Sequence, residues 1–172
     1  MILPILQYPN PKLLEKSNDV TKFDDKLSEL IESMIETCQA TDNCVGLAAI
    51  QVGIPMCLSV IKTGKKYIHI INPEIVFESK ELSSEWEGCM SIGVGDDQLF
   101  SSVARDKKIT VKYYDKYQKQ ITKQCEGFLA HAFQHEIDHM NGILFLKYAT
   151  DPTKIWKDKD LNAYIAKNNH LP

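Results

Sequence analysis

The segment from His135 to His139, with the sequence His-Glu-Ile-Asp-His, restricts the fold of this 172-residue chain more than any other feature. Histidines four residues apart lie on the same face of an α-helix, where both imidazoles can reach one metal ion. Glu136 then lies beside the ion without binding it, where its carboxylate can take a proton from water. The spacing therefore predicts a metal-binding helix that carries its own base.

Three helices are expected from the hydrophobic pattern. The metal-binding helix should run from Gly127 to Met140, because Asn141-Gly142 is a typical stop signal. An amphipathic pattern over about 24–39, with an Asp at its start as N-cap, predicts an earlier helix. A C-terminal helix is expected over about 152–167.

Residues 45 to 124 have the pattern of short strands. A turn sequence separates 56–62 from 67–72, which predicts a hairpin, and further strands are expected at 74–80, 108–114 and 120–124. Helix, many short strands, helix, helix is the order of an α+β fold. We expect short antiparallel sheets around the central metal-binding helix, flanked by an N-terminal and a C-terminal helix, in one domain over 1–172.

Composition narrows the class of protein. The net charge of −3 implies no basic face, so nucleic acid is not a favoured partner. No apolar run approaches a membrane span, and Pro4 interrupts the apolar N-terminus, so neither a membrane segment nor a secretory signal is expected. Five cysteines without a C-x-x-C pair argue against a disulfide framework and for a reducing compartment. A cytoplasmic protein is the expectation.

The usual third ligands of such motifs are missing downstream. The alternatives there, all in a polar tail, are Asp151, Asp158, Asp160 and His170. Phe145 occupies the position at which long metalloprotease signatures have a histidine, and no Glu follows Glu136. His131 lies eight residues before His139, about 12 Å along a helix, so both cannot bind one ion. A ligand from upstream is therefore expected, and the cysteines are candidates among which the residues alone do not choose.

Three segments resemble the motifs of peptide deformylases. They are Gly46 to Gln51 (Gly-Leu-Ala-Ala-Ile-Gln), Glu87 to Ser91 (Glu-Gly-Cys-Met-Ser) and Gln134 to His139. They occur in the order and at about the spacing of that family, and Ile5 to Pro9 is similar to its opening strand and turn. The resemblance covers nearly the whole chain.

The resemblance implies an activity and a metal site. Members of the family remove the formyl group from the N-terminal formylmethionine of nascent proteins, by attack of a metal-bound hydroxide. Cys89 matches the thiolate ligand, which with His135 and His139 leaves one position open for water. Ferrous iron is the implied metal, although zinc, nickel or cobalt can occupy such ligands. The implied partners are formylmethionyl peptides and nascent chains, with transient ribosome contact as a weaker idea.

The resemblance also implies how the reaction proceeds. Glu136 would take the proton from water and pass it to the leaving amine. The side-chain amide of Gln51 and the backbone N–H of Met90 match the donors that stabilise the formyl oxygen. Asp138 would either hold a ligating imidazole or be an exposed carboxylate, and Glu87 has the same two interpretations.

Substrate contacts are expected from residues at and near the motifs: Val45, Gly46, Gly88, Arg105, Phe128 and His131. Arg105, the single Arg, would lie beside the substrate groove or be a surface charge. His131 occupies a position that is usually apolar in the family. It would either line the pocket for the methionine side chain and weaken its binding, or turn away and bond a backbone carbonyl.

Several departures from the family pattern bear on substrate preference. Cys44 stands in place of a Gly, and residues 92–100 lack the Pro-Gly that commonly follows the second motif. The alternatives are a peptidase with the same metal chemistry, a deformylase-like scaffold with altered preference, and a binding-only protein. The missing downstream ligand argues against the peptidase, and the intact set of Gln51, Cys89 and Glu136 argues against loss of turnover.

Overall fold

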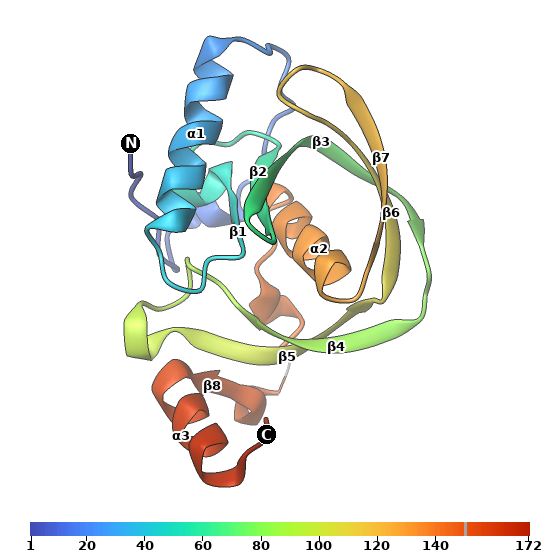
Figure 1. Ribbon diagram of the computed structural model, residues 1–172. Coiled ribbons are helices and arrows are strands. Elements are labelled where there is room, and N and C mark those ends of the chain that lie inside the picture. Colours follow the sequence, from blue (N-terminus) through green and yellow to red (C-terminus); the bar gives the residue numbers. More distant parts are fainter. Residues whose placement is uncertain (150) are drawn as a thin grey trace.

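A five-stranded antiparallel sheet curves around a central helix, α2, which carries the histidine pair (Figure 1). The computed structural model describes residues 1–149 and 151–172. The strand order is β1-β2-β3-β6-β7. The strands are β1 Gly46–Ala48, β2 Leu58–Thr63, β3 Lys66–Glu78, β6 Lys108–Tyr114 and β7 Gln120–Glu126. The α+β class expected from the sequence is confirmed.

The long strand β3 replaces two expected strands. The sequence predicted separate strands at 67–72 and 74–80, but pairing with β6 continues through this region with register shifts between Ile71 and Glu74 and between Ile75 and Phe77. Asn72 has a positive φ of 49°, a conformation that Asn tolerates better than most residues. The Asn-Pro sequence therefore bends one strand and does not end it.

A smaller sheet crosses below α2 in the view of Figure 1. It has the order β4-β5-β8, with β4 Leu82–Gly88, β5 Leu99–Asp106 and β8 Ile155–Lys157. β8 corrects the expected C-terminal helix, because Ile155 to Lys157 pairs with Leu99 to Ser101. The helix α3 begins only at Asp158 and ends at Asn168.

The other two helices lie where the hydrophobic pattern placed them. Helix α1 spans Asp25–Gln39, and the side chain of its N-cap Asp24 accepts a hydrogen bond from the N–H of Leu27 at 3.1 Å. Helix α2 spans Phe128–Met140 and ends at Asn141, as the stop signal predicted. Residues 1–149 and 151–172 also contain five 3-10 helices: η1 Pro11–Leu14, η2 Ala49–Val52, η3 Gly95–Asp97, η4 Phe145–Lys147 and η5 Pro152–Lys154.

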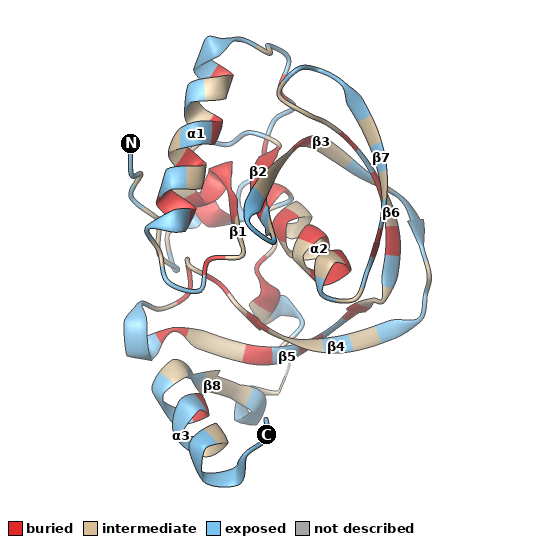
Figure 2. Cartoon of the chain, in the orientation of Figure 1, coloured by how far each residue is buried: buried red, intermediate tan, exposed pale blue. Residues whose placement is uncertain are grey.

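Helix α2 is buried on several sides, which holds its histidines in fixed positions. It contacts β1, β2, β5, β7 and η2. Phe133 is fully buried against the apolar face of the large sheet, in a cluster with Val111 and Ile61. Burial of one such side chain contributes about 1.5–3 kcal/mol. Figure 2 shows the buried residues gathered on α2, η2 and the strands around them, while α3 is largely exposed.

The cysteines depart from the expectation in one respect. Cys38 and Cys44 form a disulfide, with Cα atoms 5.3 Å apart. The loop after α1 turns back on the helix and brings the two residues together, which the six-residue spacing does not reveal. Cys89 and Cys125 are buried free thiols, and Cys57 is partly buried.

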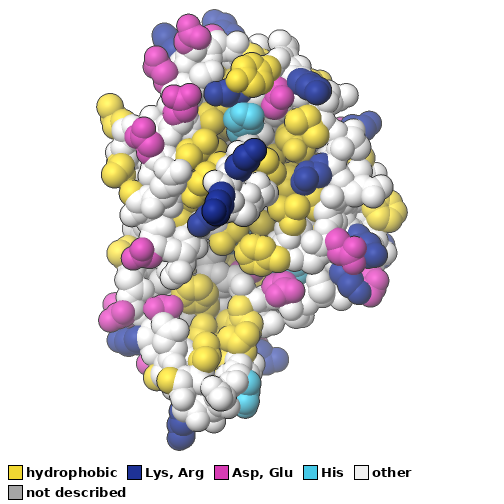
Figure 3. Space-filling model, in the orientation of Figure 1, with side chains coloured by type: hydrophobic (Ala, Val, Ile, Leu, Met, Phe, Trp, Pro, Cys, Tyr) yellow, Lys and Arg dark blue, Asp and Glu magenta, His cyan; other side chains and the backbone are white. Residues whose placement is uncertain are grey.

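The surface in the view of Figure 3 is mixed. Hydrophobic side chains gather across its middle and over the C-terminal segment, with basic side chains among those in the middle and acidic side chains mostly toward the edges. Within the described residues, no helix combines the length and hydrophobicity needed to cross a lipid bilayer.

Candidate metal centre and its pocket

A pocket of about 150 Å³ opens where β1, the end of β4 and α2 meet. It contains residues of all three motifs, which are far apart along the chain. Its walls are formed by Asn43, Val45, Gly46, Gln51, Glu85, Trp86, Glu87, Gly88, Cys89, Met90, Gln98, Phe100, Phe128, His131, Ala132, His135 and Glu136. Every expected substrate-binding residue except Arg105 is among them.

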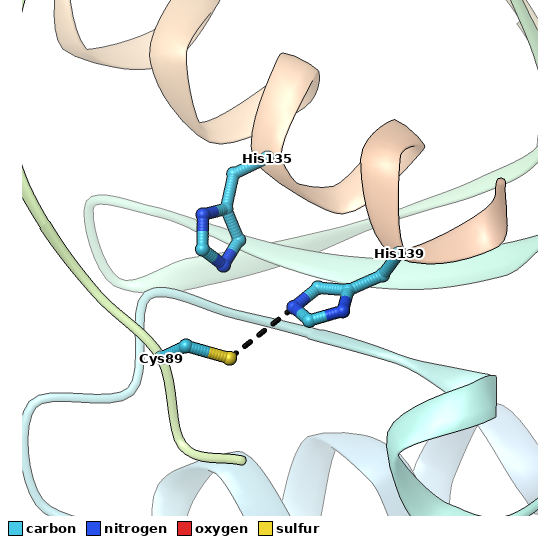
Figure 4. Close-up of side chains that lie close together, drawn as sticks. All are labelled: Cys89, His135 and His139. Carbon is cyan, nitrogen blue, oxygen red and sulfur yellow. Dashed lines mark hydrogen bonds between the residues drawn. The ribbon is translucent and has the colours of Figure 1, made fainter. Parts of the chain in front are cut away.

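Cys89, His135 and His139 lie together at this pocket (Figure 4). Each offers one ligand atom, and these atoms lie within 4.8 Å of one another. The Sγ of Cys89 is 3.3 Å from Nε2 of His139. When donors bind one ion through bonds of about 2.0–2.3 Å, the distances between the donor atoms are close to these values. One thiolate and two imidazoles also suit zinc, iron, cobalt or nickel, so the donor set fits a single divalent ion.

The two imidazoles differ in their electrostatics. Burial, followed by the charge of His135, holds the pKa of His139 well below its usual range, which favours the neutral form that binds metals. Burial opposes protonation of His135 too, but hydrogen bonds with Cys89 and Glu87 outweigh it and raise its pKa to about 10. A metal at this ring would compete with that proton.

Glu87 orients His135. Its Oε2 lies 2.9 Å from Nδ1 of His135, so the other ring nitrogen faces Cys89. Burial alone would raise the pKa of Glu87, but hydrogen bonds from His135 and Arg105 lower it to about 2. A charged carboxylate behind a ligating imidazole fixes its tautomer and direction. Of the two interpretations given for Glu87 from the sequence, the structure agrees with a carboxylate that holds an imidazole, and not with an exposed carboxylate.

Arg105 does not reach the pocket, in contrast to the expected substrate contact. Only 5% of the residue is exposed, and its guanidinium donates to both carboxylate oxygens of Glu87 and to Asp138. Tyr148 stacks over it, 4.8 Å from the guanidinium carbon to the ring centroid. Asp138 therefore neither holds an imidazole nor stands exposed, because it pairs with Arg105 at 2.7 Å. The planar fork of Arg105 supports Glu87, the residue behind His135.

Glu136 is buried beside the cluster. Burial raises the pKa of its carboxyl to about 7, near the value that suits a group that both takes and returns a proton. A Cβ at Gly46 would overlap Oε1 of Glu136, so only glycine permits this approach. The second oxygen, Oε2, accepts a hydrogen bond from Ser59 at 2.8 Å.

Gln51 is held so that its amide nitrogen faces the cluster. Its Oε1 accepts from the N–H of Ala48 at 2.8 Å, and its Nε2 lies 3.4 Å from Sγ of Cys89 and 3.1 Å from Oγ of Ser91. This places a buried amide donor beside Cys89. Met90 lines the same pocket.

His131 lines the pocket, and both its ring nitrogens have partners in the protein. Nδ1 lies 3.3 Å from Oε1 of Glu87, and Nε2 lies 3.2 Å from the hydroxyl oxygen and 3.1 Å from the backbone carbonyl of Ser83, so a neutral ring can donate to Glu87 and accept from the Ser83 hydroxyl. The ring borders the pocket, as in the first alternative from the sequence, and its Nε2 lies at a backbone carbonyl, as in the second. Its effect on methionine binding stays a prediction. Phe128, by contrast, is exposed at the pocket's edge.

Comparison with known proteins decides the family. The polypeptide deformylase model matches residues 2–154. The chain belongs to the polypeptide deformylase family. It is therefore a metal-dependent enzyme that acts on formylated peptides. A relative of this deformylase, peptide deformylase 1 of Coxiella burnetii, is 42% identical over 147 residues, or 83% of this chain and 84% of the relative.

Solved deformylases share the fold. The peptide deformylase of Legionella pneumophila has a TM-score of 0.80 and 36% identity, with full coverage of both chains. A class I type b peptide deformylase from Acinetobacter baumannii, solved with Met-Ala-Ser bound, has a TM-score of 0.79 and 27% identity and covers 86% of this chain and 98% of its own.

Sequence reasoning missed two partners at this deformylase site. The ion pair of Arg105 with Glu87 and Asp138 joins residues 18 and 33 positions apart, a pairing that no local spacing reveals. Ser59 lies in an apolar run between Leu58 and Val60. A serine in a buried strand needs a hydrogen-bond partner. That requirement could have indicated from the sequence that Ser59 bonds to another polar group.

Proposed function

We propose that this deformylase removes the formyl group from N-terminal formylmethionine with Cys89, His135 and His139 as metal ligands and Glu136 as the base. The convergence of the three potential ligands beside a buried carboxylate carries the proposal. Residues 1–172 would act as one catalytic domain.

Each of the chain's own groups has a task in this reaction. When bound, the metal polarises the formyl carbonyl and lowers the pKa of a water molecule. Glu136 accepts the proton of the attacking water and then donates it to the leaving amine. The side-chain amide of Gln51 and the backbone N–H of Met90 donate to the formyl oxygen as negative charge develops there. Glu87 keeps His135 aligned throughout.

We propose ferrous iron as the physiological metal, with zinc, nickel and cobalt able to use the same ligands. A thiolate and two imidazoles do not select among these ions by affinity alone, so availability and chemistry decide. Metal content after purification from cells grown in defined medium would identify it.

Substrate would lie along β1, with Gly46 and Gly88 allowing close approach of the peptide backbone. The first side chain would enter the pocket beside Val45, Phe128 and His131. Formylmethionyl nascent chains in the cytoplasm would be the natural substrates. Transient contact with the ribosome through the Lys-containing α3 would bring the enzyme to them.

Formate release tests this function. The metal-loaded protein should release formate from a formyl-Met tripeptide and leave an internal peptide bond intact. Glu136→Gln should keep its metal, because Glu136 is not a ligand, and lose turnover by about 10²–10⁴-fold. Cleavage of the internal bond would indicate a peptidase, and binding without formate release would indicate a protein without turnover.

A further inference from the structure

Ser59 places a hydroxyl group against the carboxylate of Glu136. It lies in β2, paired with Ala48 of β1 and Ile70 of β3, and is completely buried. Its neighbours in the strand, Leu58 and Val60, are apolar and equally buried. Its Oγ is 2.8 Å from Oε2 of Glu136. This is a hydrogen bond between two residues 77 positions apart.

The hydroxyl of Ser59 has one proton and more than one acceptor within reach. The carbonyl oxygen of Leu47 lies 2.9 Å from Oγ, and that of Val60 lies 3.3 Å away. A hydrogen bond to an ionised carboxylate is roughly twice as strong as one between neutral groups. The proton therefore goes to Glu136 whenever that carboxylate is charged.

We propose that Ser59 is a positioning residue for the base Glu136, an inference that rests on the proposed function. Its hydroxyl holds Oε2. Oε1 lies against Gly46, where a Cβ would overlap it, and Gly46 lines the pocket. The carboxylate therefore lies between the hydroxyl of Ser59 and the backbone of Gly46, which has no side chain. Its Oε1 is the oxygen that would exchange the proton with water and the leaving amine. Without the hydroxyl, the carboxylate could rotate away from that direction.

A matched pair of variants isolates the hydroxyl. Ser59→Thr keeps it, and Ser59→Val has nearly the same shape without it, so any crowding by the added methyl is common to both. We expect kcat for a formyl-Met tripeptide to be roughly ten- to hundred-fold lower in the Val variant than in the Thr variant, with KM equal, as loss of a hydrogen bond to a charged group implies. Metal content should match between the two, whereas the Tm of the Val variant should be lower, because the buried carboxylate loses its partner. Ser59→Ala removes the same oxygen without crowding and should show the same loss of kcat.

The background of Glu136→Gln separates this inference from the proposed function. If Ser59 acts through Glu136, the difference between Thr and Val should disappear in the residual activity of that background. Equal kcat for Thr and Val in the otherwise unchanged enzyme, or a difference confined to KM, would overturn the positioning role. Undiminished turnover of Glu136→Gln alone would instead overturn the proposed function, whatever the Ser59 variants show.

Discussion

At the scale of single residues, two of the chemically active side chains are held by partners from other elements. Glu87 of β4 holds His135 of α2, and Ser59 of β2 holds Glu136. The i, i+4 spacing predicted which residues of α2 share a face, because helix geometry is local. It could not predict the partners, because these come from strands that are distant in sequence.

His131 provides a prediction at this scale. Its ring is hydrogen-bonded to the buried Glu87 and to the partly buried Ser83, so His131→Ile would remove one contact from each. Glu87 keeps its bonds to Arg105 and His135. We expect the free energy of unfolding to fall by about 1–3 kcal/mol, because one of the lost hydrogen bonds is to a charged carboxylate. Urea unfolding measures this. The exposed His170 is the control, where the same change should matter by less than about 0.5 kcal/mol.

The substrate preference of the His131→Ile protein tests the same geometry. Because the nitrogens of His131 are already bonded within the protein, the ring already presents mainly carbon to the pocket. The ratio of kcat/KM between formyl-Met and a formyl peptide with a polar first residue should therefore stay within about three-fold, well below the ten-fold of one lost apolar contact. A ten-fold gain for formyl-Met would show that the imidazole is polar toward the substrate.

At the scale of elements, periodicity predicted α1 and α2 well and failed for β8. Leu27, Ile31 and Met34 recur at helical spacing and are buried on one face of α1. Ile155 and Trp156 have similar spacing to the residues of α3, but they pair with β5. Their conformation depends on a strand about 55 residues earlier, a contact that local pattern does not contain.

The disulfide between α1 and the loop before β1 provides a prediction at this scale. The Cys38–Cys44 disulfide closes a short loop that leads to Val45 and Gly46 at the pocket. A cross-link of this size stabilises the folded state by about 2 kcal/mol through the entropy of the unfolded chain. We therefore expect dithiothreitol to lower the Tm of the wild-type protein and to leave that of Cys44→Ala unchanged. Five reactive thiols in the unreduced, denatured protein would contradict the disulfide.

At the scale of the whole molecule, the acid sensitivity of folding should depend on Glu87. Its pKa is about 2 in the folded protein, against an ordinary value of 4.5. A carboxyl with a lowered folded pKa contributes stability above about pH 4.5 that is lost as the pH falls toward 2. Urea unfolding at stepped pH should show this loss in the wild type and a smaller slope in Glu87→Gln. Parallel curves would mean that Glu87 is not ionised in the fold.

The pocket is lined by four separate parts of the chain, 43–51, 85–90, 98–100 and 128–136, which explains how much of the site could be predicted from the sequence. The motifs around Gln51, Cys89 and His135 were visible because each is a continuous segment. Their meeting at one pocket depends on the sheet bringing β1 and the end of β4 against α2. The supporting contacts of Ser59 with Glu136 and of Arg105 with Glu87 became visible only in that assembly.

X-ray absorption at the metal edge tests the central claim most directly. In the zinc-loaded protein we expect one ion per chain with one sulfur ligand at about 2.3 Å and two imidazole nitrogens at about 2.1 Å. The sulfur signal should vanish in Cys89→Ala and persist in Cys125→Ala, the other buried free thiol. A wild-type spectrum without sulfur, or with a third imidazole, would contradict the assignment of Cys89, His135 and His139 as the metal ligands.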